Sequence, residues 1–393
     1  MSSFAKRISA LQPSAIRELL IHGSDPSVIS FGGGFPDPAL FPAEDLRAAF
    51  EEAPTDGGNS RLQYTFSDGL PALREQVAQR MTRAGTPCTI DDVLIIQGAQ
   101  QGLDLVAKLM LDPGDVVITE APTFLGALLA FNPYQPSYAP VAMDADGMDT
   151  DDLERVLTAH PETKLIYTVP EFQNPTGVTM TLERRRRLIE LATRFDVLVI
   201  EDSPYRELRY GGEDVPTLKS LDTEDRVVHL GSFSKILAPG LRLGWSIAGP
   251  EITAKLALLK LAADTQRSTL NMAAVSAYLQ RHDIDTHIKT LCTAYGRKRD
   301  LILATIAAEF PADVRATRPD GGLFTWLSFP EGFDTAEFMA TQALPLARVA
   351  YVPGATFFPT VQQPNHARVS FATLPEEKIV DGITRLGALL RTA

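Results

Sequence analysis

Five short apolar runs rich in valine and isoleucine alternate with segments of helical periodicity through the middle of this chain of 393 residues. The intervening residues 100–111 and 182–195 have the apolar spacing of amphipathic helices. Apolar strands connected by helices are typical of a parallel sheet that is buried on both faces. The pattern therefore predicts an α/β protein with a doubly wound, mostly parallel central sheet, whose strands are Val93–Ile96, Val116–Thr119, Leu165–Val169, Val197–Ile200 and Val227–Leu230.

The two ends of the chain follow a different pattern. A short amphipathic helix is expected to begin at Ser14 and end at Gly23, and isolated strands are expected near residues 322–327 and 367–371 between long helices. This α+β pattern predicts a smaller domain built from both chain ends. We expect an N-terminal segment (1–50) that joins the small domain, a large domain (51–290) and a C-terminal small domain (291–393).

Charge and composition narrow the function classes. The net charge of −12 provides no electrostatic footprint for duplex nucleic acid or for an anionic membrane surface. Two cysteines, Cys88 and Cys292, cannot form a disulfide framework, and no run reaches the roughly 18 apolar residues of a membrane span. We therefore expect a cytoplasmic protein without membrane or nucleic-acid partners. The basic run Arg184–Arg187 lies in a helical pattern and is expected to be a solvated face.

Polar motifs follow the carboxyl ends of the predicted strands, where open α/β sheets bind their ligands. They are Gly98–Gln101, Asn174–Gly177, Asp202–Tyr205 and Ser232–Lys235, with Arg242 nearby in the sequence. A P-loop, a dinucleotide-binding glycine motif and a zinc-binding HExxH motif are absent from the sequence. We therefore expect a small-molecule site at this edge, and the sequence gives little support to nucleotide hydrolysis or metal-dependent hydrolysis there.

Lys235 is the first candidate for that chemistry, because a lysine amine can form a Schiff base with an aldehyde cofactor. Ser232, Ser234 and Arg242 would supply the hydroxyl groups and the bidentate guanidinium that bind a phosphate dianion. A lysine beside a phosphate-binding group indicates pyridoxal 5'-phosphate (PLP).

PLP also requires a carboxylate against its ring nitrogen, and Asp202 follows a predicted strand where it could provide one. Tyr205 and Asn174 could hydrogen-bond the ring oxygen, and Phe124 offers an aromatic face for stacking. The helix that begins near Gly98 would direct its N-terminal amide groups toward the phosphate.

With these residues the sequence resembles the PLP-dependent class I/II aminotransferases of fold type I, especially the 2-aminoadipate and kynurenine aminotransferase branch. The resemblance covers nearly the whole chain. Its motifs are Ser14–Glu18, Phe31–Pro36, Leu62–Tyr64, Gly69, Leu73–Arg74, Gln173–Gly177, Asp202–Tyr205, Gly231–Lys235, Pro239–Gly244, Gly321–Gly322 and Arg368–Phe371.

The resemblance implies a role for each matching residue. Lys235 would hold the cofactor as a Schiff base and move the proton, Asp202 would pair with the ring nitrogen, and Asn174 and Tyr205 would bind the ring oxygen. Arg368 would pair with the substrate α-carboxylate. The phosphate would be bound by Ala99, Gln100, Ser232, Ser234 and Arg242.

Further implied contacts depend on neighbouring segments and on a second subunit. Gly33 or Gly34 would line the substrate pocket, and Tyr64 would reach the phosphate of the neighbouring subunit in a homodimer with shared sites. Arg17 matches a position that can bind a distal substrate carboxylate, although it could equally pair with an acidic neighbour. Arg267 is a weaker pocket candidate, because a polar turn before Leu270 explains it equally well.

Two residues depart from the family pattern: Ala99 replaces a common serine and Phe124 replaces a common tyrosine. Ala99 can offer only its backbone N–H, so phosphate binding should depend more on Ser232, Ser234 and Arg242. Phe124 can stack but cannot donate a hydrogen bond.

The expected function is transfer of the amino group of an L-amino acid to a 2-oxo acid such as 2-oxoglutarate by a ping-pong mechanism. The substrate would be of the 2-aminoadipate, aromatic or branched-chain type; Arg17 favours a dicarboxylic substrate, whereas Phe31, Phe35, Phe357 and Phe358 favour a bulky apolar one. A PLP-dependent β-lyase or decarboxylase is the alternative, since the same cofactor stabilises any Cα carbanion. A non-catalytic, effector-sensing regulator is a remote alternative, because the acidic chain offers no DNA-binding segment ahead of Tyr64.

Overall fold

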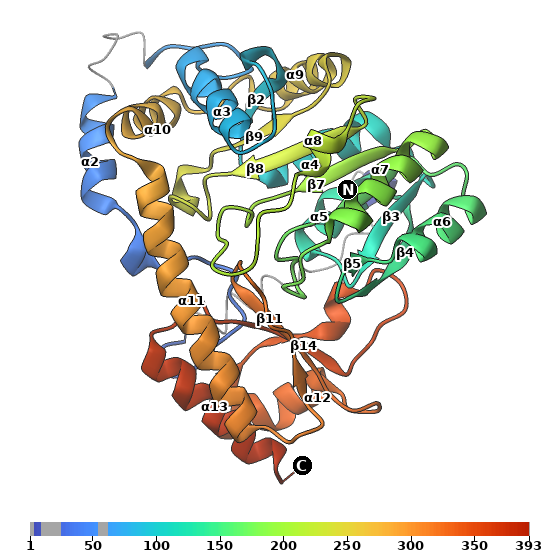
Figure 1. The fold of residues 1–393 in the computed structure, drawn as a ribbon, viewed down its shortest axis with the longest axis vertical. Helices are drawn as coiled ribbons and strands as arrows, with labels where there is room; N and C mark the ends of the chain where they lie inside the picture. Colours follow the sequence, from blue (N-terminus) through green and yellow to red (C-terminus); the bar gives the residue numbers. More distant parts are fainter. Residues whose placement is uncertain (1–3, 9–24, 54–61, 393) are drawn as a thin grey trace.

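The structure, a computed structural model, describes residues 4–8, 25–53 and 62–392. Eight strands form one large sheet in the order β2-β9-β8-β7-β6-β3-β4-β5 (Figure 1). All five predicted apolar runs form strands of this sheet, whereas the pattern missed β4, β5 and β9. The strands are β2 (Val93–Ile96), β3 (Val116–Ala121), β4 (Ser137–Asp144), β5 (Gly147–Met148), β6 (Leu165–Thr168), β7 (Leu198–Asp202), β8 (Val227–Ser232) and β9 (Gly244–Ile247).

The large sheet is mostly parallel, as predicted. β4, β3, β6, β7 and β8 pair in parallel. β9 is antiparallel to both of its neighbours, so β2 runs in the same direction as β8. The carboxyl ends of all five predicted strands therefore lie along one edge, where their polar motifs meet.

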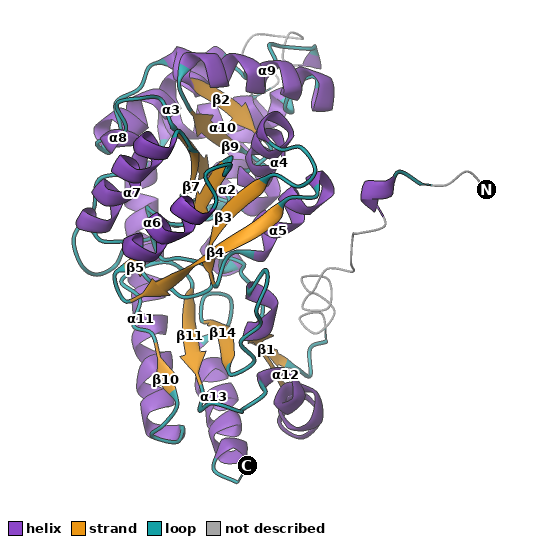
Figure 2. Ribbon diagram, turned by 90° about the vertical axis from the view of Figure 1, so that its right-hand side faces the viewer, coloured by secondary structure: helices purple, strands orange, loops and turns teal. Residues whose placement is uncertain are grey.

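Helices cover both faces of this sheet (Figure 2). Alternate residues of β3 enter separate cores: Val116 and Ile118 pack in one that includes Leu188 of α7, and Val117 packs in the other, which includes Leu103 of α4. Each fully buried aliphatic side chain contributes about 1.5–3 kcal/mol. The helices are α2 (Ala43–Glu52), α3 (Pro71–Arg83), α4 (Ala99–Met110), α5 (Leu125–Phe131), α6 (Thr150–Ala159), α7 (Leu182–Phe195), α8 (Leu218–Leu221), α9 (Pro250–Asp264) and α10 (Thr269–Arg281).

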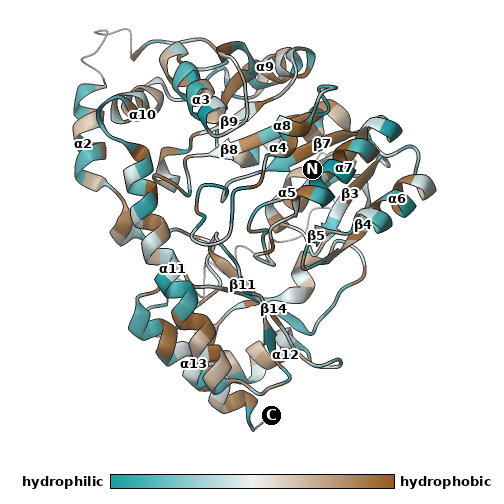
Figure 3. Ribbon diagram, in the orientation of Figure 1, coloured by the Kyte–Doolittle hydropathy of each residue, from teal (hydrophilic) through white to brown (hydrophobic). Residues whose placement is uncertain are grey.

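The hydropathy of the residues agrees with a buried sheet covered by helices. Hydrophobic residues concentrate on the central strands, whereas the outer helices α6 and α7 carry hydrophilic residues (Figure 3). The large sheet is therefore the buried middle layer of the fold.

A smaller antiparallel sheet lies below the large one in Figure 1, in the order β10-β11-β14-β13. The N-terminal strand β1 pairs in parallel with β12, so residues from both chain ends come together there. These elements are β1 (Ile29–Ser30), β10 (Arg315–Ala316), β11 (Phe324–Ser328), β12 (Val349–Ala350), β13 (Val352–Pro353), β14 (His366–Ser370), α11 (Ile284–Glu309), α12 (Thr335–Phe338), the π-helix η7 (Met339–Ala347) and α13 (Glu376–Leu390).

The expected domain limits fall inside helices. Residue 50 lies in α2 and residue 290 lies in α11. The three-part division stays a proposal, and the helix expected over residues 14–23 lies outside the described residues. Within the described part of the chain, no helix is both long enough and apolar enough to cross a membrane.

The expectation that Arg184–Arg187 forms a solvated face is wrong for Arg185. Its side chain is fully buried and pairs with the buried Glu171 at 3.1 Å. It also donates to the carbonyl oxygens of Pro170 and Met180, at 3.1 and 3.0 Å. Because a helix of 3.6 residues per turn cannot present four consecutive residues on one face, one residue of this run must point inward.

Candidate active site

A cavity of about 450 Å³ opens at the carboxyl edge of the large sheet. It is bounded by the loops after β2, β3, β6, β7 and β8, by residues 32–35, and by one residue of β14. Most of the predicted site residues line it: Gly33, Gly34, Ala99, Gln100, Phe124, Asn174, Asp202, Tyr205, Ser232, Ser234, Lys235, Arg242 and Arg368.

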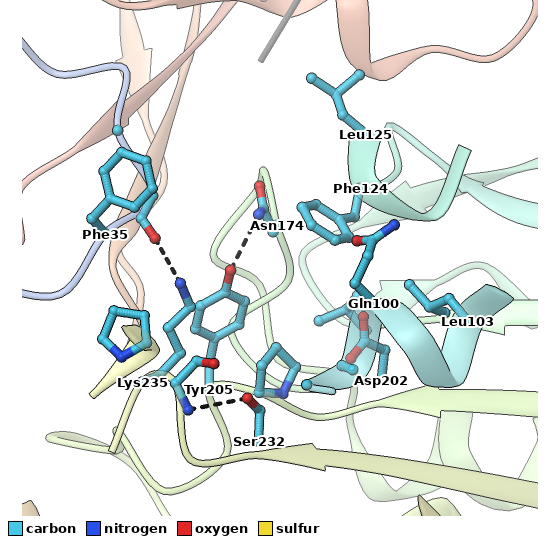
Figure 4. Close-up of a pocket in the computed structure, with 18 of the residues that line it drawn as sticks. Phe35, Gln100, Leu103, Phe124, Leu125, Asn174, Asp202, Tyr205, Ser232 and Lys235 are labelled. Carbon is cyan, nitrogen blue, oxygen red and sulfur yellow. Dashed lines mark hydrogen bonds between the residues drawn. The ribbon is translucent and has the colours of Figure 1, made fainter. Parts of the chain in front are cut away.

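Lys235 follows β8 and points into the cavity toward Gly34 (Figure 4). Its Nζ donates to the carbonyl oxygen of Gly34 at 2.8 Å. Burial, together with the positive charges of Arg368 and Arg242, lowers the pKa of Lys235 to about 8. About a tenth of this amine is therefore unprotonated at pH 7, far more than for an ordinary lysine, and a nucleophilic lysine requires the unprotonated form.

Asp202, at the end of β7, is buried and has only one of its two oxygens paired. Oδ2 accepts a hydrogen bond from the Tyr167 hydroxyl at 2.9 Å, whereas the buried Oδ1 has no partner among the described residues. Burial raises the pKa of Asp202 to about 6, and the bond from Tyr167 opposes this rise. A buried carboxylate oxygen without a donor is costly, so this site fits a cationic N–H group.

Asn174 connects the other polar groups of the cavity. Its Nδ2 donates to the Tyr205 hydroxyl at 3.2 Å, and its Oδ1 accepts from Nη1 of Arg368 at 2.8 Å. Arg368 also donates to the carbonyl oxygen of Gly32 at 2.7 Å, while its Nε is buried without a partner among the described residues. Burial lowers the pKa of Arg368 to about 10 and raises that of Tyr205 to about 12. Arg368 thus remains a cation at neutral pH and can bind a carboxylate.

The start of α4 and Arg242 bring groups that attract an anion to the same part of the cavity. Gly98 is the N-cap of α4 and has φ +68°, a conformation that favours glycine. A Cβ at Gly98 would lie 3.4 Å from Nη2 of Arg242, so a side chain would fill the space in front of the helix N-terminus. Ser232 and Ser234 line the same cavity. Amide groups of a helix N-terminus, hydroxyl groups and a guanidinium together match a phosphate.

These observations fit PLP. The cavity places a lysine amine, a carboxylate oxygen without a donor and a phosphate-type cradle around one space. The Phe124 ring packs against Gly126, where a Cβ would come within 2.4 Å of it, and it lines the cavity, where it can flank a bound ring. At Ala99 the backbone N–H is the available donor.

Other predictions for the site fare differently. Tyr64 does not line the cavity; it is 78% exposed and borders a separate surface hollow with Gln266 and Ser268. Arg17 lies outside the described residues. Among the four phenylalanines expected near the substrate, Phe35 lines the cavity, whereas Phe31, Phe357 and Phe358 are buried in the cores.

The sequence analysis missed two buried residues that support the site, Tyr167 and Glu120. Tyr167 bonds Asp202, and Glu120 accepts from Thr168 Oγ1, from the Val169 amide at 3.3 Å and from Gln173 Nε2 at 3.0 Å. The same Nε2 donates to the Pro122 carbonyl oxygen at 2.8 Å, so this network joins the turn before Phe124 to the turn that carries Asn174. Both residues could have been noticed in the sequence, because each is a polar side chain within or just after a predicted aliphatic strand.

Comparison with known proteins identifies the family. The sequence matches Aminotransferase class I and II over residues 27–386. It is 39% identical to aromatic-amino-acid aminotransferase 1 of Thermococcus litoralis, covering 99% of this chain and 94% of that protein, and 38% identical to 2-aminoadipate transaminase of Thermus thermophilus, covering 99% and 96%.

A solved structure agrees with these relatives. The kynurenine aminotransferase of Pyrococcus horikoshii, solved in complex with PMP, superposes with a TM-score of 0.93 at 37% identity over 99% of this chain and 97% of that one. The mostly parallel sheet, the cavity at its carboxyl edge and the smaller antiparallel sheet are those of PLP fold type I. The chain therefore belongs to the class I and II aminotransferases, PLP-dependent enzymes of fold type I.

Proposed function

We propose that this aminotransferase moves the amino group of an L-amino acid to a 2-oxo acid such as 2-oxoglutarate by a ping-pong mechanism. The donor leaves as its 2-oxo acid before the acceptor enters the same cavity. The observation that carries the proposal is the placement of Lys235, the half-paired Asp202 and the carboxylate-binding Arg368 around one space of about 450 Å³.

The cofactor, when bound, supplies an aldehyde that takes up the amino group and a ring that withdraws electrons from the substrate Cα. Asp202 Oδ1 would accept a hydrogen bond from the ring nitrogen and keep it protonated. Asn174 and Tyr205 would bind the ring oxygen, and Phe124 would stack on the ring. Ser232, Ser234, Arg242 and the amide groups of Ala99 and Gln100 would bind the phosphate.

Lys235 Nζ would remove the proton from the substrate Cα and return it on the neighbouring carbon of the cofactor. Its lowered pKa, about 8, suits an amine that must accept and release a proton near neutral pH. Arg368 would bind the α-carboxylate through the two nitrogens that now contact Asn174 and Gly32. This anchor would orient the Cα–H bond toward Lys235, which is what favours amino transfer over loss of the carboxylate.

We propose a substrate of the aromatic, branched-chain or 2-aminoadipate type. The related enzymes act, by their names, on aromatic amino acids, 2-aminoadipate and kynurenine. Phe35 and Leu125 line the cavity and would contact an apolar side chain, and Gly33 and Gly34 leave room for it. Arg17 is the proposed partner of a distal carboxylate.

We also propose a homodimer with shared active sites. Tyr64, Leu62 and Phe66 are 78%, 67% and 70% exposed on the single chain, which is unusual for three large side chains in one short segment. A second subunit would cover them, and Tyr64 would reach the phosphate in the partner's site.

Two measurements test the activity. An absorbance scan should show a cofactor band that changes on addition of the amino donor, and a coupled assay should show turnover that requires both an amino acid and 2-oxoglutarate. Release of ammonia or carbon dioxide without an oxo-acid acceptor would instead establish the lyase or decarboxylase alternative. Absence of acceptor-dependent turnover across a broad panel of amino acids would refute the proposal.

A further inference from the structure

Arg267 is a buried arginine just behind the anion-binding end of the cavity, in the turn between α9 and α10. Its Nη1 donates to Oε1 of Gln97 at 2.7 Å, and its Nη2 donates to the backbone carbonyl oxygen of Arg242 at 3.3 Å. It is not one of the residues that line the cavity. Any effect of Arg267 on a bound group must therefore pass through Gln97 and Arg242 or through its charge.

The two partners of Arg267, Gln97 and Arg242, both adjoin the anion-binding site. Gln97 immediately precedes Gly98, the N-cap of α4, and its carbonyl oxygen accepts from Nη2 of Arg242 at 3.3 Å. Arg242 itself has φ +51°, a left-handed conformation that a residue with a side chain rarely adopts. The bond from Arg267 to the Arg242 carbonyl oxygen holds that conformation, which directs the Arg242 guanidinium toward the start of α4.

The charge of Arg267 is only partly balanced within the described residues. Asp264 is its ion-pair partner, at 3.8 Å, but the same carboxylate lies 2.8 Å from the buried Lys260 Nζ and accepts a bond of 2.8 Å from Gln101. Nε of Arg267 is buried and has no hydrogen-bond partner among the residues that the structure describes. Burial, and the nearby charge of Arg242, lower the pKa of Arg267. Excess positive charge therefore lies behind the helix N-terminus, and an anion in front of it would reduce the electrostatic cost.

The turn around Arg267 has other hydrogen bonds that shape it. Ser268 caps α10 by accepting from the Asn271 amide at 3.3 Å, and Asn271 Nδ2 donates to the Leu241 carbonyl oxygen at 3.0 Å. Gln266 Nε2 donates to Thr269 Oγ1 at 3.1 Å. The guanidinium of Arg267 takes no part in these bonds and is directed to the anion-binding site, so a polar turn alone does not account for it.

We propose that Arg267 is a phosphate-positioning residue of this enzyme. It holds Arg242 and the Gln97–Gly98 junction in the geometry that binds the cofactor phosphate, and it adds positive charge behind that phosphate. The inference rests on the proposed cofactor site and extends it to a residue that the phosphate does not touch.

The experiment compares two cofactor forms that differ only in the phosphate. Apo-enzyme is titrated with PLP and with pyridoxal, and the dissociation constants are measured by absorbance for the wild type, Arg267→Gln and Arg267→Lys. We expect Arg267→Gln to weaken PLP binding about tenfold or more, as loss of hydrogen bonds from a charged group implies, and to change pyridoxal binding less than about twofold. The PLP dissociation constant of Arg267→Lys should lie between those of the wild type and Arg267→Gln, because lysine keeps the charge but loses the bidentate hydrogen bonding of the guanidinium.

Arg74→Gln is the matched control. Arg74 is likewise a largely buried arginine that bonds two backbone carbonyl oxygens, those of Val93 and Ile90, and one carboxylate, that of Asp68. Its loss should lower the melting temperature while leaving the ratio of the PLP and pyridoxal dissociation constants unchanged. This control separates a role directed at the phosphate from the general cost of removing a buried arginine.

Two results would overturn the inference: an unchanged PLP dissociation constant in Arg267→Gln, or an equal weakening of PLP and pyridoxal. If Arg267→Gln does not fold, the ratio of the PLP and pyridoxal dissociation constants is compared between Arg267→Lys and the wild type instead, and an unchanged ratio would overturn the inference. Failure of the wild type itself to bind PLP would refute the proposed function instead, so the two failures are distinguishable.

Discussion

The hydrogen bond from Tyr167 to Asp202 leads to a quantitative prediction for Tyr167→Phe. The Tyr167 hydroxyl donates to Asp202 Oδ2 at 2.9 Å, and both side chains are buried. A hydrogen bond to a buried charged group contributes about 1.5–3 kcal/mol. Since a shift of one pKa unit corresponds to about 1.4 kcal/mol, removing the hydroxyl should raise the pKa of Asp202 by about one to two units.

The sign follows from which form of Asp202 accepts the bond. The tyrosine hydroxyl stabilises the carboxylate, so its removal favours the protonated acid and moves the pKa further above about 6. The free enzyme must have Asp202 ionised to pair with the cofactor ring nitrogen. In the wild type, the affinity for PLP should therefore fall below a pH of about 6. In Tyr167→Phe it should begin to fall at a pH about one to two units higher.

The assay is the PLP dissociation constant of the apo-enzyme, measured by absorbance from acid to neutral pH for both proteins. Titration of PLP itself is common to both, so the difference between the two curves reports Asp202. Tyr138→Phe is the control, because it removes a hydroxyl that bonds Asn132 at 2.7 Å far from the cavity, in strand β4. Coincident pH curves for Tyr167→Phe and wild type would refute the reasoning, as would an equal displacement in Tyr138→Phe.

Three further predictions follow from single side chains. Arg368→Lys should raise the KM of both the amino acid and the oxo acid about a hundredfold, because two parallel hydrogen bonds to a carboxylate become one. The affinity for PLP should change little. Steady-state kinetics would measure the two KM values. Glu120 has a pKa of about 7, raised by burial, so its contribution to stability is full below its unfolded pKa of about 4.3 and is lost as the pH rises through 7. Glu120→Gln should abolish that part of the pH dependence in denaturant unfolding, because the amide does not titrate in this pH range. Phe35→Ala should widen the cavity. It should lower kcat/KM for leucine about tenfold more than it lowers kcat/KM for tryptophan, and a competition assay between the two substrates would measure this difference.

Each of the three has a result that contradicts it. An unchanged KM for both acids would remove Arg368 from carboxylate binding. A pH dependence of unfolding that is the same in wild type and Glu120→Gln would show that Glu120 is not the titrating group. Equal losses for leucine and tryptophan would mean that Phe35 does not contact the substrate side chain.

Local patterns in the sequence predicted five of the eight strands of the large sheet and the main polar residues around the cavity. The five valine- and isoleucine-rich runs all form strands of the large sheet. Successive side chains of a strand point to opposite faces, so a continuous apolar run suits a sheet that is buried on both faces. Parallel strands align their carboxyl ends, so motifs as distant as Gly98–Gln101 and Ser232–Lys235 were expected to meet, and they line one cavity. Strands β4 and β9 escaped prediction because their residues alternate or contain glycine and serine, and pairing with neighbouring strands stabilises them.

Which polar groups are paired, and which are left for a ligand, depends on contacts that form only in the folded chain. Asp202 and Arg185 are both charged residues in the sequence. Within the described ranges, however, one oxygen of Asp202 is buried without a donor, whereas Arg185 bonds carbonyl oxygens and Glu171. The position of Arg267 behind Arg242 likewise depends on the turn between α9 and α10 lying against Gln97 and Arg242, which no local pattern encodes. Five strands, the chemistry of the motifs and their common edge could be predicted from the sequence, because these features depend on local periodicity and residue type. Hydrogen-bond partners, burial and pKa shifts depend on contacts between residues distant in the chain, and these exist only in the folded structure.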